Sequence, residues 1–277
     1  MEPKKASWMQ QALEAKLNEA DPLTFTGADV AWLIAHVGDL DGHIRDDLTF
    51  TLIARGVLAG GFTAAQQRRV NDAIVASKQI FSGIDAPQNN AVFLRSFTAL
   101  IGSCILQADA QRPFLTRTDR GLWFQWALEY LYRERDWRGY VAGHGFAHAL
   151  AHGSDLLAAA LAHPLFGSAR QEVVLGTVRA VLDRIIQPLA EDEEERLANA
   201  LKQGLQAHTL SQATLTHFLT ATDQALWQGA DSERAAGYRL SAWKRVLQTL
   251  YFLAPSLQQA CLPLLRHYYR ENGYLES

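Results

Sequence analysis

The sequence predicts an all-α protein, an α-α superhelix of about twelve helices packed as antiparallel pairs. Apolar residues recur at spacings of three and four along almost the whole chain, whereas the strict alternation that marks a strand is nearly absent. The predicted helices pair off about every 40 to 45 residues, the period of HEAT-type two-helix repeats. Because each unit of such an array packs on its neighbours, we expect residues 1–277 to form a single helical-repeat domain.

In the N-terminal half, the apolar runs are bounded by capping residues and glycines. Thr26 and Thr63 each precede a run and can accept a hydrogen bond from the backbone of a first helical turn. The turn at 38–42 and the pair Gly60-Gly61 interrupt the pattern, as expected of loops. The helices predicted for this half lie at about 7–18, 26–37, 44–59 and 63–80.

The remaining apolar runs are also helical. Segment 118–135 is dense in aromatic residues at helical spacing, which predicts core side chains. The acidic run 191–195 is expected to open a helix, because negative charge is favourable in a first turn. The helices predicted here lie at about 90–108, 118–135, 145–162, 168–186, 191–207, 211–227, 239–253 and 256–271.

The charge balance argues against nucleic acid as a partner. The formal net charge is −3, whereas a protein that binds a duplex usually carries a strongly basic face. The arginines between 112 and 138 are interleaved with carboxylates, a pattern typical of a solvated, ion-paired helix face. We therefore expect no nucleic-acid partner.

Cysteine content and hydropathy point to the cytoplasm. Cys104 and Cys261 are the two cysteines, and each sits in an apolar helical run, as a small buried hydrophobe does. A secreted chain more often carries a disulfide framework. Residues 1–20 have no apolar signal core, and no stretch approaches the roughly 18 uninterrupted apolar residues of a membrane span. We expect a cytoplasmic protein with no membrane partner.

One segment, 136–155, carries a pattern that chemistry could use. It reads DWRGYVAGHGFAHALAHGSD and places His144, His148 and His152 four residues apart, with Asp155 following. At about 100° per residue, His152 lies roughly 40° from His148 around a helix, and Asp155 lies about 20° to the other side. Apolar residues and Gly153 fall on the opposite face, where a close helix neighbour is expected. The polar stripe would then face water or a groove.

Metal binding is one interpretation of this stripe. Imidazoles four residues apart on a helix can bind a divalent metal ion, and a carboxylate one turn later can complete the set of His148, His152 and Asp155. The segment HALAH has the histidine spacing of a zinc-protease HExxH helix, but Ala149 replaces the glutamate. Peptidase chemistry is disfavoured because the general base is missing.

Two further interpretations remain open. The stripe could bind a polar or anionic ligand without metal, with help from Arg138, Tyr140 and the glycine-rich turn before the helix. Alternatively, the histidines hydrogen-bond neighbouring helices and fix the packing of the array. No nucleophile elbow, phosphate loop or dinucleotide motif accompanies them.

At this segment the sequence resembles an uncharacterised bacterial family, the domain-of-unknown-function family twenty-seven eighty-five. Its pattern is similar to R-G-Y-V-x-G-K-G-W-x-H-x-x-x-H-x-x-D, and further similarity lies in 93–97 and 44–48. This chain departs from the pattern at His144, where lysine is more usual, at Phe146, where tryptophan is, and at Asn90, where aspartate is. The resemblance covers most of the chain.

The resemblance implies a helical-repeat fold and carries no established activity. It also suggests that Arg95 converges with segment 136–155 on one surface, paired with Asp46, Asp47 or Asp155. A buried arginine needs such a partner.

These observations predict a protein that binds a small polar ligand or a protein partner through a His/His/Asp site in its concave face. The alternatives are a metal-dependent hydrolase or lyase acting on a small molecule at the same residues, and a purely structural interaction scaffold. The expected ligand-binding residues are Arg95, Arg138, Tyr140, His144, His148, His152 and Asp155, and the expected metal ligands are His148, His152 and Asp155.

Overall fold

The computed structural model describes residues 7–86, 88–230 and 233–276. Within these ranges the chain folds into twelve α-helices and one two-stranded hairpin, so the all-α prediction is confirmed. The helices are α1 (Trp8–Lys16), α2 (Gly27–Ala35), α3 (Thr51–Leu58), α4 (Ala64–Ser77), α5 (Ala91–Gln111), α6 (Arg117–Arg133), α7 (Ala149–Ala162), α8 (Gln171–Asp183), α9 (Glu193–Gln206), α10 (Gln212–Gln228), α11 (Arg234–Leu253) and α12 (Gln258–Glu271). A π-helical segment, His43–Phe50, leads into α3, and short 3₁₀ turns lie at Gln79–Phe81, Ser168–Arg170 and Pro255–Leu257.

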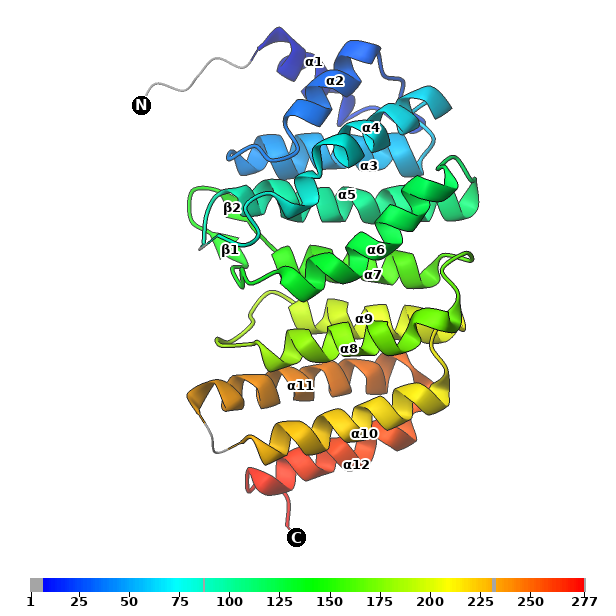
Figure 1. Cartoon of the computed structure of the whole chain (residues 1–277). Helices are drawn as coiled ribbons and strands as arrows, with labels where there is room; N and C mark the ends of the chain where they lie inside the picture. Colours follow the sequence, from blue (N-terminus) through cyan, green and yellow to red (C-terminus); the bar gives the residue numbers. More distant parts are fainter. Residues whose placement is uncertain (1–6, 87, 231–232, 277) are drawn as a thin grey trace.

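The helices stack on one another in two layers, with α1 and α12 at opposite ends (Figure 1). In one layer α3 packs on α5, α5 on α7, α7 on α9 and α9 on α11. In the other, α6 packs on α8, α8 on α10 and α10 on α12, and α6 also packs across onto α5 and α7. Successive helices alternate between the layers, as expected of antiparallel pairs. The superhelical path and the likeness to HEAT repeats stay predictions.

Local sequence explains several helix starts. Thr26 Oγ1 accepts a hydrogen bond from the backbone N–H of Asp29 at 3.1 Å, and the Asp29 carboxylate accepts one from the N–H of Thr26 at 2.8 Å. The same reciprocal arrangement links Thr63 and Gln66. These capping boxes satisfy backbone donors that a helix leaves free, so both predicted caps are confirmed.

The prediction of a helix from about residue 145 is wrong at its start, because α7 begins at Ala149. The preceding residues form a hairpin in which β1 (Tyr140–Val141) pairs antiparallel with β2 (Gly145–Phe146). Gly143 and Gly145 have φ angles of +81° and +80°, which side chains rarely adopt. The glycines therefore fold the chain back on itself here.

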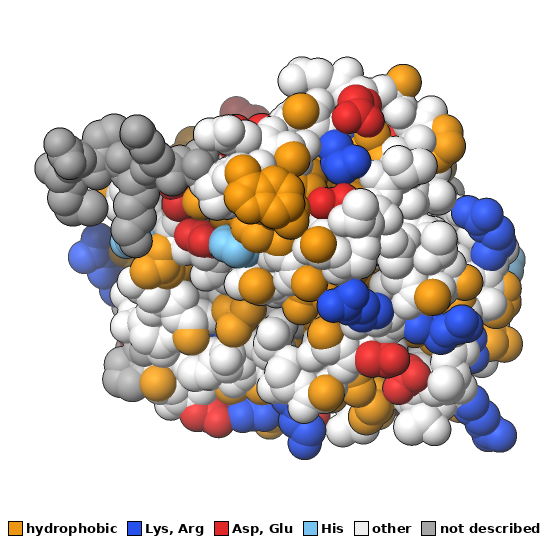
Figure 2. Space-filling model, turned by 90° about the horizontal axis from the view of Figure 1, so that it is seen from above, with side chains coloured by type: hydrophobic (Ala, Val, Ile, Leu, Met, Phe, Trp, Pro, Cys, Tyr) orange, Lys and Arg blue, Asp and Glu red, His pale blue; other side chains and the backbone are white. Residues whose placement is uncertain are grey.

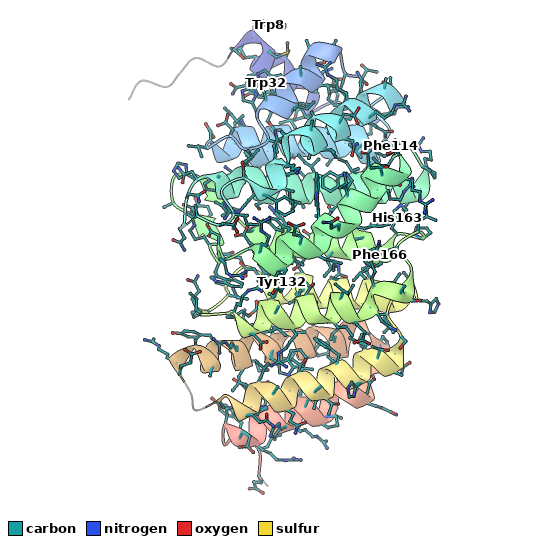
Figure 3. All side chains as sticks on the ribbon, in the orientation of Figure 1. Trp8, Trp32, Phe114, Tyr132, His163 and Phe166 are labelled. Carbon is teal, nitrogen blue, oxygen red and sulfur yellow. The ribbon has the colours of Figure 1, made fainter. Side chains whose placement is uncertain are left out.

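The core lies between the two layers. Four of the aromatic residues of α6 are buried, as predicted: Trp123, Phe124, Trp126 and Tyr130. Tyr132, at the end of the same helix, is instead 56% exposed, and Figure 3 shows it on the surface of the stack. Cys104 and Cys261 are free and buried, as expected.

Helix α5 runs through the centre of the core. It is long and apolar enough to cross a membrane by length and composition, but 78% of that window is buried inside the protein. Helices α3, α4, α6 and α7 all pack against it. The apolar composition of α5 therefore fits a helix in the centre of the core.

The α1 end of the stack leaves apolar side chains in contact with solvent. Trp8 is 75% exposed there, and Trp32 stacks on the ring of His36 with 3.7 Å between the ring centroids. Figure 2, which looks down on this end, shows hydrophobic atoms next to a histidine and to acidic side chains. A terminal helix packs on fewer neighbours than an inner one, which explains this exposure.

Helices α6 and α7 are in close contact at Gly153. A Cβ placed on Gly153 would lie 2.8 Å from side-chain atoms of Tyr130 and Leu131. Real carbon atoms do not approach so closely, so a side chain here would push the two helices apart. The close helix neighbour expected at this glycine is present.

Gly153→Ala is therefore expected to lower the free energy of unfolding by about 1 to 2 kcal/mol, because overpacking outweighs the gain in helix propensity. Gly176→Ala is the control, since Gly176 lies inside α8 with open space around its Cβ position. This change should raise stability by up to about 1 kcal/mol. Urea unfolding measures both, and equal stabilisation in the two variants would contradict the close packing.

Candidate ligand-binding groove

The hairpin of segment 136–155 is held by Arg45, a fully buried residue of the π-helical segment. Its Nη2 donates to the carbonyl oxygens of His144, at 2.7 Å, and Phe146, at 3.3 Å. Its Nη1 donates to the carbonyl oxygen of Asp39 at 2.7 Å, and its Nε lies 2.7 Å from Asp46 Oδ1. The guanidinium thus ties the N-terminal helices to the hairpin through backbone groups.

His144 lies in the turn of this hairpin and not on a helix with the other histidines. Its Nδ1 lies 3.0 Å from the carbonyl oxygen of Leu40, and its ring lies 5.6 Å from that of Phe93. The prediction that His144 continues the stripe of α7 is wrong, because the chain reverses at Gly145. Its contacts fit a packing role.

A second buried arginine, Arg95 of α5, holds the start of the same segment. Its Nε and Nη2 donate to the two carboxylate oxygens of Glu134 at 2.6 and 3.0 Å, and Nη2 lies 3.6 Å from Asp136. Arg138 donates to Asp136 at 2.8 Å and to the carbonyl oxygen of Asn89 at 2.9 Å. Two arginines and two carboxylates therefore neutralise one another in the interior.

The expected pairing of Arg95 with Asp46, Asp47 or Asp155 is wrong. Asp46 pairs with Arg45, and Asp155 pairs with Arg196. The reason is the end of α6, which turns Glu134 back toward α5. The carboxylate of Glu134 also accepts hydrogen bonds from the backbone N–H groups of residues 135 and 136, which hold it in position for Arg95.

His152 is buried between α5 and α7. Its Nδ1 lies 2.7 Å from Ser96 Oγ, and the edge of its ring meets Phe97. The single hydroxyl proton of Ser96 goes to the carbonyl oxygen of Ala147, so Nδ1 of His152 is the donor toward Ser96. Burial holds the pKa of His152 well below its usual value, and the ring is neutral.

His148 precedes α7 in a left-handed conformation, with φ of 47°. Its ring stacks on Phe146 with 4.4 Å between the centroids and is perpendicular to His152 at 5.6 Å. Its Nε2 is buried with no hydrogen-bond partner among the residues that the structure describes. Burial, with the nearby Arg196 charge, lowers the pKa of His148 to about 4. It is a neutral ring at physiological pH.

Asp155 pairs with Arg196 of α9. Burial raises the pKa of this carboxyl above its usual value. In the described part of the chain, no three His, Cys, Asp or Glu side chains are grouped so that they could hold a metal ion. The predicted metal ligands His148, His152 and Asp155 are therefore not assembled into one set.

Tyr140 is the remaining predicted site residue. It is 61% exposed on β1, and its ring meets the edge of Phe146 at 5.2 Å. It thus covers the hairpin from outside. Of the seven predicted residues, Asp155 alone lines a groove that crosses α5, α7 and α9.

A groove of about 460 Å³ crosses three consecutive helices of one layer, α5, α7 and α9. It lies on the face of α7 opposite Gly153, away from α6. Alanines on α7 form part of its floor, and their small side chains leave the space. Its lining consists of Phe50, Leu100, Ser103, Cys104, Gln107, Asp155, Ala158, Ala159, Ala162, Asn199 and Gln203.

The polar groups of this groove are mainly carboxamides. Gln107, Asn199 and Gln203 each offer a donor and an acceptor. In the described residues, the amides of Gln107 and Gln203 have no hydrogen-bond partner. The one carboxylate, that of Asp155, is neutralised by Arg196. The volume lies within the range of about 300 to 1,000 Å³ that is common for small-molecule sites.

The Cys104 thiol in the groove is not an activated nucleophile. Burial raises the pKa of Cys104 to about 11, so the thiolate that attacks an electrophile is scarce at neutral pH. The neutral histidines lie outside the lining. The groove is equipped for hydrogen bonding.

Sequence reasoning missed most of this groove. Its residues come from three helices far apart in sequence and are polar but uncharged, so they form no motif. One signal was present: after Asp155, α7 has alanines at 158, 159 and 162 on one face, which predicts a depression there.

The fold and the groove define a class: a stack of antiparallel helix pairs with an uncharged polar groove across one layer. Residues 80–252 match the family described as "Protein of unknown function (DUF2785)", and the chain belongs to this family. The match spans α5 to α10 and nearly all of α11, and includes all the groove residues except Phe50. No curated protein and no solved structure matches the chain.

Arg95→Ala should lower the free energy of unfolding by about 3 to 5 kcal/mol, because Glu134 and Asp136 would be left buried and underpaired. Arg179→Ala is the control, since Arg179 forms an exposed pair with Asp183 on α8. Arg179→Ala should lower the free energy of unfolding by less than about 1 kcal/mol. Chemical unfolding of both variants tests this, and similar small losses would show that the Arg95 network adds little.

Acid should destabilise the protein through His148. The unfolded histidine binds a proton below about pH 6.5, whereas the folded one does so only near its pKa of about 4. The contribution of His148 to the free energy of unfolding is fully present above pH 6.5 and is lost as the pH falls toward 4. His148→Asn is a suitable variant for comparison, because asparagine tolerates a left-handed backbone and does not titrate in this range.

We therefore expect the wild type to lose stability relative to His148→Asn between pH 6.5 and 4. The comparison matters because buried carboxyls with a raised pKa, such as Glu194 at about 7, change stability in the opposite direction. Parallel pH profiles of the two proteins would contradict the low pKa of His148.

Proposed function

We propose that this protein is a binding module that holds a small, uncharged polar ligand in the groove across α5, α7 and α9. The observation that carries the proposal is the pair of amides, Gln107 and Gln203, which face the groove without hydrogen-bond partners within the described residues. Gln107 is exposed and Gln203 is half-buried, so a ligand with its own donors and acceptors, such as an amide, a sugar or a nucleoside, would replace water on these amides.

The charge of the groove supports an uncharged ligand. Asp155 and Arg196 form an ion pair, so neither is free to attract a ligand of the opposite sign. Phe50 and Leu100 add apolar surface beside the amides. Most small-molecule sites combine such an apolar lining with a few polar groups that fix the orientation.

A protein partner is a second candidate occupant. The groove crosses three helices of one layer, and helical arrays bind partners across such faces. An extended segment would present backbone amides to Gln107, Asn199 and Gln203. We do not propose the metal-dependent hydrolase or lyase, because within the described residues His148, His152 and Asp155 are not grouped as a set that could hold a metal ion.

The test is a thermal-shift screen of amides, sugars, nucleosides and short peptides, followed by calorimetry of each hit. A Gln107→Ala/Gln203→Ala variant should bind a hit at least about tenfold more weakly, because each lost hydrogen bond contributes about 0.5 to 1.5 kcal/mol. Gln206→Ala, an exposed position on α9 outside the groove, should bind like the wild type.

Alkylation of Cys104 locates the hit. Bound ligand should slow the reaction of Cys104 with iodoacetamide, whereas Cys261, which is fully buried elsewhere, reports global opening. Ala162→Trp fills the groove from an exposed position and should abolish binding. A hit that binds this variant unchanged lies elsewhere, and a screen without hits in either ligand class would contradict the proposal.

A further inference from the structure

A second pocket, of about 440 Å³, lies in the other layer, beside the first turns of α6 and α8. It is at the end of the helices opposite the hairpin, because α7 begins at the hairpin and ends next to this pocket. Figure 3 shows Phe114, His163 and Phe166 at this end of the stack. The lining consists of Arg117, Arg120, Gly121, Phe124, Leu165 and Arg170.

Three of the lining residues are arginines, and none is acidic. Arg120 is held in place by Asp109, whose carboxylate accepts a hydrogen bond from Arg120 Nη2 at 3.1 Å. Within the described residues, Arg117 and Arg170 form no ion pair with a carboxylate. Two cationic groups are therefore available to a ligand.

The neighbouring carboxylates are already engaged. Asp109 is fully buried and accepts hydrogen bonds from the backbone N–H groups of Phe114 and Leu115, in addition to its pair with Arg120. It also lies 3.1 Å from His163 Nε2. Asp119 accepts a hydrogen bond from the Thr116 hydroxyl at 2.7 Å. The lining of the pocket is therefore cationic, and Asp119 and Glu172 are the acidic residues in the first turns of α6 and α8.

Apolar surface lies beside the charges. Phe124 is buried in contact with Phe166, with 5.1 Å between ring centroids, and Leu165 is 62% exposed at the rim. The Arg170 guanidinium lies over both rings, 5.4 Å from that of Phe166. Gly121 has no atom within 4 Å of its Cβ position, so the space in front of it is open.

Two helix N-termini lie beside the arginines. Helix α6 begins at Arg117 and α8 begins directly after Arg170, and the two helices pack side by side. A helix N-terminus carries a partial positive charge and favours anions. Charge, apolar surface and open volume thus coincide at one place.

We propose that this pocket binds an organic anion, a phosphate or carboxylate group joined to a compact apolar or aromatic body. Arg117 and Arg170 would pair with the anionic group, and the body would lie against Phe124 and Leu165. The site is separate from the groove of the proposed function, because no residue lines both.

The experiment titrates the full-length protein with phenyl phosphate and with benzoate, and compares both with inorganic phosphate and phenol. Phenyl phosphate, benzoate or both should bind, and the better of them should bind at least tenfold more tightly than either fragment. Its affinity should fall as salt rises, since ion pairs carry part of the binding. Inorganic phosphate bound as tightly as phenyl phosphate would overturn the organic part of the proposal and indicate a simple anion site.

Two pairs of variants locate the binding. Arg117→Ala/Arg170→Ala should weaken it at least tenfold, and Arg179→Ala on the exposed part of α8 should not. Gly121→Glu places a carboxylate among the arginines and should abolish binding, whereas Gly121→Ala should preserve it. All four positions are surface positions, and circular dichroism checks the fold.

Equal affinity in the wild type and the double arginine variant would overturn the proposal, as would the absence of binding by both phenyl phosphate and benzoate. The Gln107→Ala/Gln203→Ala variant should bind the anion normally. Normal binding by this variant would show that the anion does not bind in the groove across α5, α7 and α9.

Discussion

The structure depends on the rule that a buried charge must be paired. Arg45 and Arg95 lie in the interior, and each is paired there with a carboxylate, Asp46 and Glu134. Arg45 fixes the hairpin to the N-terminal helices, and Arg95 fixes the end of α6 to α5. Removing either partner would leave a charge in a medium of low polarity. The two arginines therefore set how three sequence-distant parts meet.

This constraint changes the meaning of the histidine pattern. Spacing of four residues brings imidazoles together only when one helix carries them, and here a hairpin and a left-handed residue intervene before α7 begins. His144 meets Leu40, His152 meets Ser96, and His148 stacks on Phe146. Three similar residues thus have three different environments. Gly143 and Gly145 adopt the positive φ angles that the hairpin turn requires.

The two candidate sites follow from the two-layer architecture. Each layer brings parallel helices side by side, so small residues on one layer leave a groove across several helices, as alanines do on α7. In the other layer, neighbouring helices begin at the same end, so their N-termini and the arginines beside them combine. One site is polar and uncharged, the other cationic, and they lie on different layers.

By itself the sequence determined the helical class, most helix positions, the capping threonines and the close packing at Gly153. These are local properties, because helical periodicity, caps and small residues act within a few positions of the chain. The tertiary structure alone decided that Arg95 pairs with Glu134, that Asp155 pairs with Arg196, and that Gln107 and Gln203 line one groove. Those contacts join residues dozens of positions apart, and they depend on the rotation and depth of each helix in the stack, which no local pattern encodes.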